Sequence, residues 1–115
     1  MRTLLTVCLS VVALYAHHSF AAEFDATKPV TLTGTVTRLE WANPHAHLYM
    51  DVKGDKITSW VFELRSPNVL LREGWTRNTI QPGTVVTVKG FRAKNGSATA
   101  VVRDVILSDG RRVLH

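Results

Sequence analysis

Alternating apolar and polar residues dominate the chain after residue 29 and predict β-strands. Val30, Leu32 and Val36 alternate with threonines, which is the period-two pattern of a strand with one buried face. The apolar phase reverses after Arg38, and we expect a β-bulge there because a bulge inserts one extra residue. Turn residues bound the runs that follow. The later strands are expected over residues 45–53, 56–64, 84–93 and 97–107, with a short tail strand after residue 110.

One short helix is predicted between the third and fourth strands. Ser66 suits the N-cap, Pro67 suits the first helical position, and Gly74 ends the helix. Three strands, a helix and a closing hairpin form the order of an OB-like barrel, in which the helix covers the open end. We therefore expect an all-β, five-stranded OB-like barrel over residues 30–115. An open β-sandwich is the alternative.

The first sixteen residues have the pattern of a secretory signal peptide. Arg2 supplies positive charge, and the apolar run of residues 4–15 is shorter than the roughly 20 residues of a transmembrane helix. A buried N-terminal helix is the alternative, but His17 and His18 end the run abruptly.

The cleavage site has two candidates. Cleavage after Ala16 leaves His17 as the first residue. Cleavage after Ala21 puts Ser19 at position −3, which fits the small-residue rule better, but it removes both histidines of the pair. Residues 17–29 have no clean period and are interpreted as an N-terminal arm.

The composition of the exported chain excludes several classes of site. Cys8, the single cysteine, lies in the apolar run, so the mature chain has no disulfide, thiolate nucleophile or cysteine zinc site. The chain carries 14 Lys and Arg against 9 Asp and Glu, and removal of Arg2 lowers the net charge from +5 to +4. This excess suits anionic partners, but export argues against nucleic acid, and a solvated mixed-charge surface is the simpler interpretation. No transmembrane segment is expected after cleavage.

Several motifs resemble those of a family of small exported bacterial proteins classed as a domain of unknown function. The matching stretches include Ala16-His17-His18-Ser19-Phe20, the EWANPHA run of residues 40–46, Ser66-Pro67-Asn68 and the LREGWT run of residues 71–76. The resemblance covers essentially the whole mature chain and implies an OB-like exported domain with no established activity. The chain is also similar, more loosely, to periplasmic bacterial OB-fold proteins, which are thought to be binding modules. In the family the histidine pair commonly follows the signal directly, which favours cleavage after Ala16.

Four of the five histidines form two groups, His17-His18 and His45-x-His47. Residues two apart on a strand share a face, so His45 and His47 project together. After cleavage at residue 16, His17 supplies an amine and an imidazole, and a strand histidine adds a third nitrogen. Such a site resembles a histidine brace and favours Cu(II). We therefore predict a metal site from these four histidines and no other cofactor. The alternative is that they only form hydrogen bonds.

Trp41, Asn43, Arg72 and Trp75 are candidates for a ligand or partner surface. Tryptophan and arginine together are typical of binding surfaces, and OB-folds bind ligands across strands two and three and the flanking loops. The alternative is that Trp41 belongs to the core and that Trp75 packs the helix end against the barrel. Trp60 is expected in the core.

The sequence gives catalysis little support. It has no nucleophile elbow, thiol or phosphate loop, and Glu40, Glu63 and Glu73 are not obviously paired. We therefore expect a non-enzymatic, periplasmic or secreted binding module that binds copper through its histidines. The alternative is a metal-free interaction domain, an accessory subunit of an envelope enzyme, whose partner is an unknown envelope protein or a small ligand. A nucleic-acid-binding OB protein is the third possibility and is incompatible with export.

Overall fold

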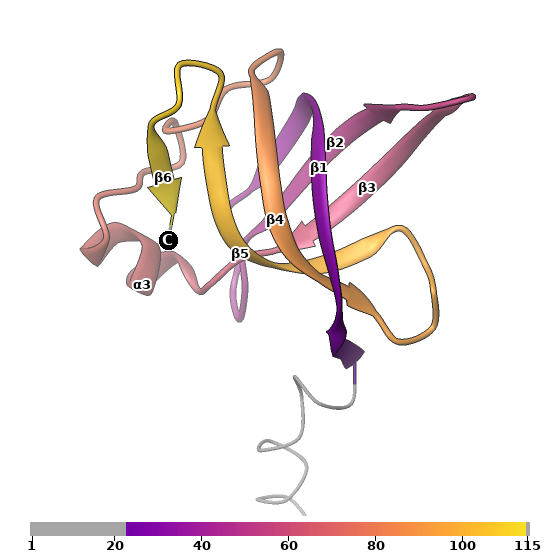
Figure 1. The fold of residues 1–115 in the computed structure, drawn as a ribbon. Coiled ribbons are helices and arrows are strands. Elements are labelled where there is room, and N and C mark those ends of the chain that lie inside the picture. Colours follow the sequence, from indigo (N-terminus) through magenta and orange to yellow (C-terminus); the bar gives the residue numbers. More distant parts are fainter. Residues whose placement is uncertain (1–22, 115) are drawn as a thin grey trace, which may run out of the picture.

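The computed structural model describes residues 23–114, which fold into a β-barrel with a short helix at one end (Figure 1). The expected signal peptide, and with it His17 and His18, lies outside the described residues. The elements are β1 (Phe24–Glu40), β2 (His47–Lys53), β3 (Ile57–Glu63), α3 (Pro67–Arg72), β4 (Val85–Ala93), β5 (Thr99–Leu107) and β6 (Arg112–Leu114).

Five of the strands close into a ring. The sheet order is β3-β2-β1-β4-β5-β6 with antiparallel neighbours, and β3 also pairs with β5 in parallel. This extra pairing confirms the predicted five-stranded barrel and excludes the open sandwich. The helix lies between the third and fourth strands as predicted, and β6 is the expected tail strand.

The first strand begins earlier than the sequence pattern suggests. Phe24 already pairs with Ala93, and Pro29 pairs with Phe91, so the expectation of an irregular arm up to residue 29 was wrong for residues 24–29. The register is irregular between Phe24 and Pro29, which removes the alternation that would reveal a strand. This part of β1 pairs only with β4, so its other side is locally an edge of the sheet. Pro29 is tolerated there because an edge position needs no N–H donor on its unpaired side.

The predicted bulge lies between Val36 and Arg38, where the pairing of β1 with β2 shifts register. Val36 is 1% exposed in the core, and Leu39 packs against the same core from beyond the bulge. The extra residue therefore lets one bent strand bury a face on both sides of the bend.

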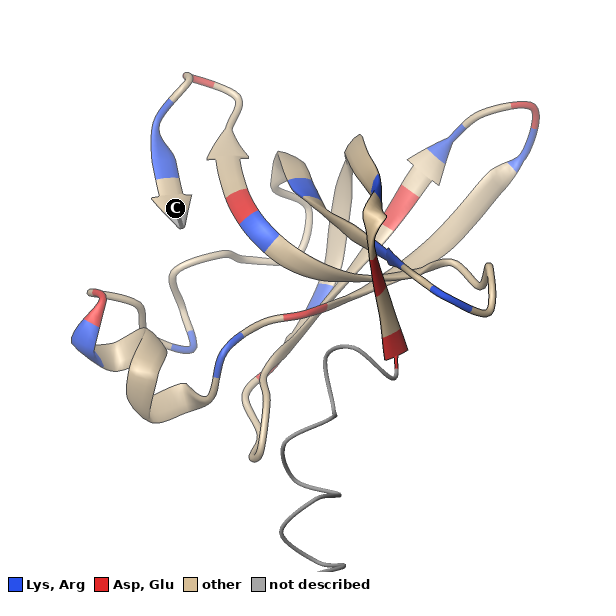
Figure 2. Cartoon of the chain, turned by 60° about the horizontal axis from the view of Figure 1, so that its bottom comes forward, with Lys and Arg blue, Asp and Glu red and all other residues tan. Residues whose placement is uncertain are grey.

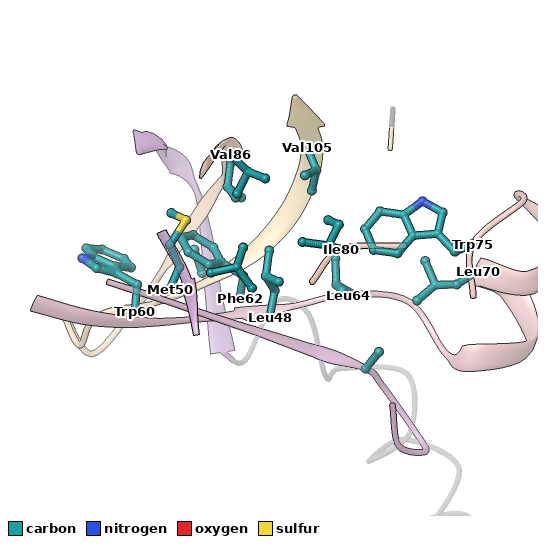
Figure 3. Close-up of a cluster of buried hydrophobic side chains, with 14 residues drawn as sticks. Leu48, Met50, Trp60, Phe62, Leu64, Leu70, Trp75, Ile80, Val86 and Val105 are labelled. Atoms are coloured by element: carbon teal, nitrogen blue, oxygen red, sulfur yellow. The ribbon is translucent and has the colours of Figure 1, made fainter. Parts of the chain in front are cut away.

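Apolar side chains from α3 and all five strands of the ring fill the barrel (Figure 3). Leu48, Met50 and Phe62 are completely buried. Trp60 stacks on Phe62 with ring centroids 5.9 Å apart, which confirms its place in the core. The buried members of this cluster are Val36, Ala46, Leu48, Met50, Trp60, Phe62, Leu64, Leu70, Trp75, Ile80, Val86, Val88, Ala100 and Val105.

The helix starts and ends at the predicted residues. Ser66 is its N-cap and accepts a hydrogen bond from the Val69 N–H at 3.4 Å, with Pro67 as the first helical residue. Gly74 follows the C-cap with a φ of 94°, a left-handed conformation that favours glycine.

Charged side chains are distributed over the whole barrel. Figure 2 shows Lys and Arg interspersed with Asp and Glu along the strands, in agreement with a mixed-charge surface. Within residues 23–114, no helix is both long and apolar enough to cross a membrane.

A close approach of β4 to β5 gives a test of the fold. A Cβ at Gly90 would lie 2.0 Å from the Val101 carbonyl oxygen, whereas a Cβ at Gly54 would have Lys56 O at 3.8 Å as its nearest neighbour. We expect Gly90→Ala to lower the free energy of unfolding by about 1–3 kcal/mol, because the backbones must separate. Urea denaturation measures this, with Gly54→Ala as the control that stays near wild type. Equal stability of the two variants would contradict this packing.

Candidate functional site

A row of polar side chains crosses three neighbouring strands on the outside of the barrel. Glu40 of β1 stands opposite His47 of β2, and His47 stands opposite Glu63 of β3. Directly opposite residues of antiparallel strands share a face of the sheet. The neighbouring pair Leu48 and Phe62 faces the other way and is fully buried. The row therefore lies on the outer face of the sheet, and the core lies on its inner face.

Both strand histidines turn their Nδ1 atom toward a carboxylate of this row. His45 Nδ1 lies 2.7 Å from Glu63 Oε1, and His47 Nδ1 lies 3.3 Å from Glu40 Oε1. The His47 atom is buried and lacks hydrogen-bond geometry, so its contact with Glu40 is electrostatic only. The shorter contact of His45 is the stronger of the two.

His45 precedes β2 but is held as if it were part of the strand. The Ala46 N–H donates to the Arg65 carbonyl at 3.0 Å, and the Leu64 N–H donates to the Ala46 carbonyl at 2.8 Å. These two bonds extend the β2–β3 ladder past its ends. They fix the backbone beside His45 and aim its imidazole at Glu63.

The row is half buried, and Arg38 pairs with Glu40 at one end of it. The Glu63 side chain is 17% exposed and that of His45 is 42% exposed. Arg38 pairs with Glu40 and also lies over the Tyr49 ring, with its guanidinium carbon 4.6 Å from the ring centroid. Glu40 is therefore fixed between a guanidinium and an imidazole.

A pocket of about 410 Å³ opens beside the row. His45 and Glu63 form part of its wall, and Arg65, which also lines it, is paired with Glu73. The other lining residues are Glu23, Phe24, Leu64, Ser66, Val69, Val101 and Val102. The pocket thus joins an apolar floor to the charged end of the row.

This arrangement is suited to metal ligation through Nε2. When a carboxylate engages Nδ1 of a histidine, Nε2 is left as the nitrogen that binds the metal, and such carboxylates orient ligating histidines in metalloproteins. No group of three or more His, Cys, Asp or Glu in the described part of the chain could hold a metal ion alone. A metal bound by His45 and His47 therefore needs a donor from elsewhere.

The sequence-predicted residues fall into different environments. His45 and His47 each contact a different carboxylate of the row, whereas His17 and His18 lie outside the described residues. Tyr49 is half buried on the same face.

The predicted partner surface is only partly available. Trp75 is 2% exposed, and its indole N–H donates to the Val113 carbonyl, so Trp75 packs the helix end against β6 and is not a surface residue. Trp41 is partly buried against the core, and Asn43 and Arg72 are exposed. No hydrogen bond or ion pair joins the four residues to one another.

Sequence reasoning missed Glu40 and Glu63. The sequence pairs neither of them obviously, yet Glu63 contacts His45 just before β2, and Glu40 contacts His47 in β2. The signal available was the outward phase of Glu63 in its strand, which requires an outward residue such as His47 opposite it.

A family model matches residues 5–103, which include most of the barrel and all of the polar row. The chain belongs to DUF6152, a family of unknown function. This confirms the expectation of an unknown-function family and assigns no activity. No curated protein matches the chain.

The His45–Glu63 contact predicts the tautomer of the imidazole. We expect the neutral imidazole of His45 to carry its proton on Nδ1, because Glu63 Oε1 lies 2.7 Å from that nitrogen. Glu63→Ala should shift the population toward the Nε2–H tautomer. Two-bond ¹H–¹⁵N correlation spectra measure both states. Glu73→Ala is the control, since Glu73 pairs with Arg65 and not with a histidine; equal tautomer populations in all three proteins would refute the contact.

Proposed function

We propose that this DUF6152 protein is an exported, non-enzymatic binding module that binds Cu(II). The ligands are the amine and imidazole of His17 together with Nε2 of one or both of His45 and His47, with His18 nearby. The observation that carries this proposal is the orientation of the two strand histidines, each with Nδ1 against a carboxylate. The periplasm or the extracellular space is the proposed location, on the basis of the apolar run of residues 4–15.

The carboxylates give the strand histidines the environment of metal ligands. A carboxylate that accepts the Nδ1 proton fixes the ring orientation and raises the basicity of Nε2. Glu63 Oε1 lies 2.7 Å from His45 Nδ1, and Glu40 Oε1 lies 3.3 Å from His47 Nδ1.

The N-terminal donor is within reach of this site. Glu23, the first described residue, lines the same pocket as His45. The chain from residue 17 to residue 23 spans at most about 20 Å when extended. After cleavage at Ala16, the amine of His17 can therefore meet the imidazole of His45.

The donor chemistry favours copper over other divalent ions. The proposed ligands are an amine and imidazoles, and nitrogen sites bind Cu(II) most tightly in the divalent series. The mature chain contains no thiolate, because the single cysteine of the full chain, Cys8, lies in the segment that cleavage removes. An all-nitrogen site without sulfur suits Cu(II) better than Cu(I).

Copper titration of the mature protein tests the ligand set. His45→Ala together with His47→Ala should weaken Cu(II) binding at least about a hundredfold, because loss of ligands costs more than loss of the carboxylates that orient them. His115→Ala, which changes the histidine outside both groups, is the control and should bind like wild type.

The N-terminus of the mature chain must be read in the same experiment. Mass spectrometry of the exported protein should give His17 as the first residue. A chain that begins at Ala22 contradicts the proposal, and so do equal affinities of wild type and the double variant.

The carboxylates provide a second, separate test. Glu63→Gln should lower Cu(II) affinity about 10–100-fold while the histidines remain, because an amide orients the imidazole less strongly than a carboxylate. Competition with a chelator of known affinity measures the change. Glu73→Gln removes a carboxylate that pairs with Arg65 and not with a histidine, and should have no effect. Equal losses in the two variants would show a general charge effect instead.

The alternative, a metal-free interaction domain, has weaker support. Its proposed surface loses Trp75 to the core, and Trp41 is partly buried. Asn43 and Arg72 are still exposed. On this interpretation, the variant with both His45→Ala and His47→Ala would still bind its envelope partner.

A further inference from the structure

We infer that the pocket beside His45 is the docking site of the chain's own residues 17–22, with the side chain of Phe20 in its apolar part. The inference rests on the proposed function in one respect, namely that cleavage after Ala16 keeps this segment on the mature protein. It does not require a metal. It goes beyond the proposed function by assigning a binding site to the segment as a whole.

The pocket has a floor suited to an aromatic ring. Phe24 is 5% exposed and Leu64 is 3% exposed, and Val69, Val101 and Val102 also line the pocket. These groups come from β1, the β3–α3 connection, α3 and β5, so the floor is built by elements far apart in the sequence. Burial of an aromatic side chain against such a floor removes a large apolar area from water.

The covalent connection selects the occupant. Glu23 and Phe24 both line the pocket, and the chain leaves the barrel there. Phe20 is three residues before Glu23, and three residues span at most about 10 Å. A segment tethered within that distance competes with any free ligand at high effective concentration.

A second depression nearby is less suitable for Phe20. It has a volume of about 440 Å³ and also includes Glu23 and Phe24. Its remaining lining comes from the β4–β5 hairpin and is mostly polar: Ala93, Lys94, Asn95, Ser97 and Thr99. An aromatic ring prefers the aliphatic wall of the first pocket.

The charges of the pocket also match the segment. Glu23 and Glu63 contribute two carboxylates, whereas the guanidinium of Arg65 is already paired with Glu73. The segment His17-His18-Ser19-Phe20-Ala21-Ala22 carries an α-ammonium group and two imidazoles, and no acid. Complementary charge therefore favours its basic end at the wall that contains Glu63.

Docking would prepare the copper site before the metal arrives. A ring anchored in the pocket restricts the positions open to His17 and holds its amine near His45. Ligands held in place before binding lose less freedom when the metal binds. The pocket thus has a defined role in the affinity of the proposed site.

Metal-free NMR of the mature protein in a chelator tests the docking. We expect nuclear Overhauser contacts between the Phe20 ring protons and the methyl groups of Val69, Val101 or Val102. Phe20→Ala should remove the ring-current shifts of those methyls and leave Val86 and Val88, in the core, unchanged. Ser19→Ala is the matched control and should keep the wild-type shifts. In a copper titration, Phe20→Ala should weaken binding about tenfold through loss of this anchoring.

Several results would overturn the docking. One is a Phe20 ring without contacts to the valine methyls. Another is a set of methyl shifts that depends on protein concentration, because a neighbouring chain would then fill the pocket. The two proposals fail separately: copper binding by His17 without Phe20 contacts overturns the docking alone. Phe20 contacts without copper binding overturn the metal site alone.

Discussion

The barrel closes where β3 and β5 run parallel over the pairs Val61–Thr99, Phe62–Ala100 and Glu63–Val101. The remaining strands are joined by antiparallel hairpins or by the long first strand, so this contact decides between a barrel and an open sheet. It also brings the aliphatic wall of β5 against Glu63. Both the closed core and the pocket beside the histidines therefore depend on the same three residue pairs.

Much of the fold follows from local signals. The alternation of apolar residues predicts strand faces because each strand buries one side, and the phase reversal at Arg38 predicts the bulge. Ser66 and Gly74 mark the limits of α3 through capping chemistry, which acts over a few residues. Features set by neighbouring residues in the chain were thus predictable.

Features set by pairing between strands were harder to predict. The strands expected over residues 45–53 and 56–64 leave two residues for the turn, but Lys53 pairs with Ile57, which moves the register by one residue. That one step decides whether Phe62 or Glu63 stands opposite His47, and so which face the carboxylate occupies. The contact of Glu40 depends in addition on the bulge in β1. The start of β1 was hidden by irregular pairing before Pro29.

The strict alternation along β2 separates two properties of the molecule. Leu48 and Met50 specify the fold from inside, while their neighbours His47 and Tyr49 face outward and leave the core untouched. Natural sequence drift or laboratory design can therefore exchange the outward set while the inward set continues to maintain the scaffold. In a barrel of this kind, the residues that specify the fold and the residues that carry the surface chemistry are therefore separate sets.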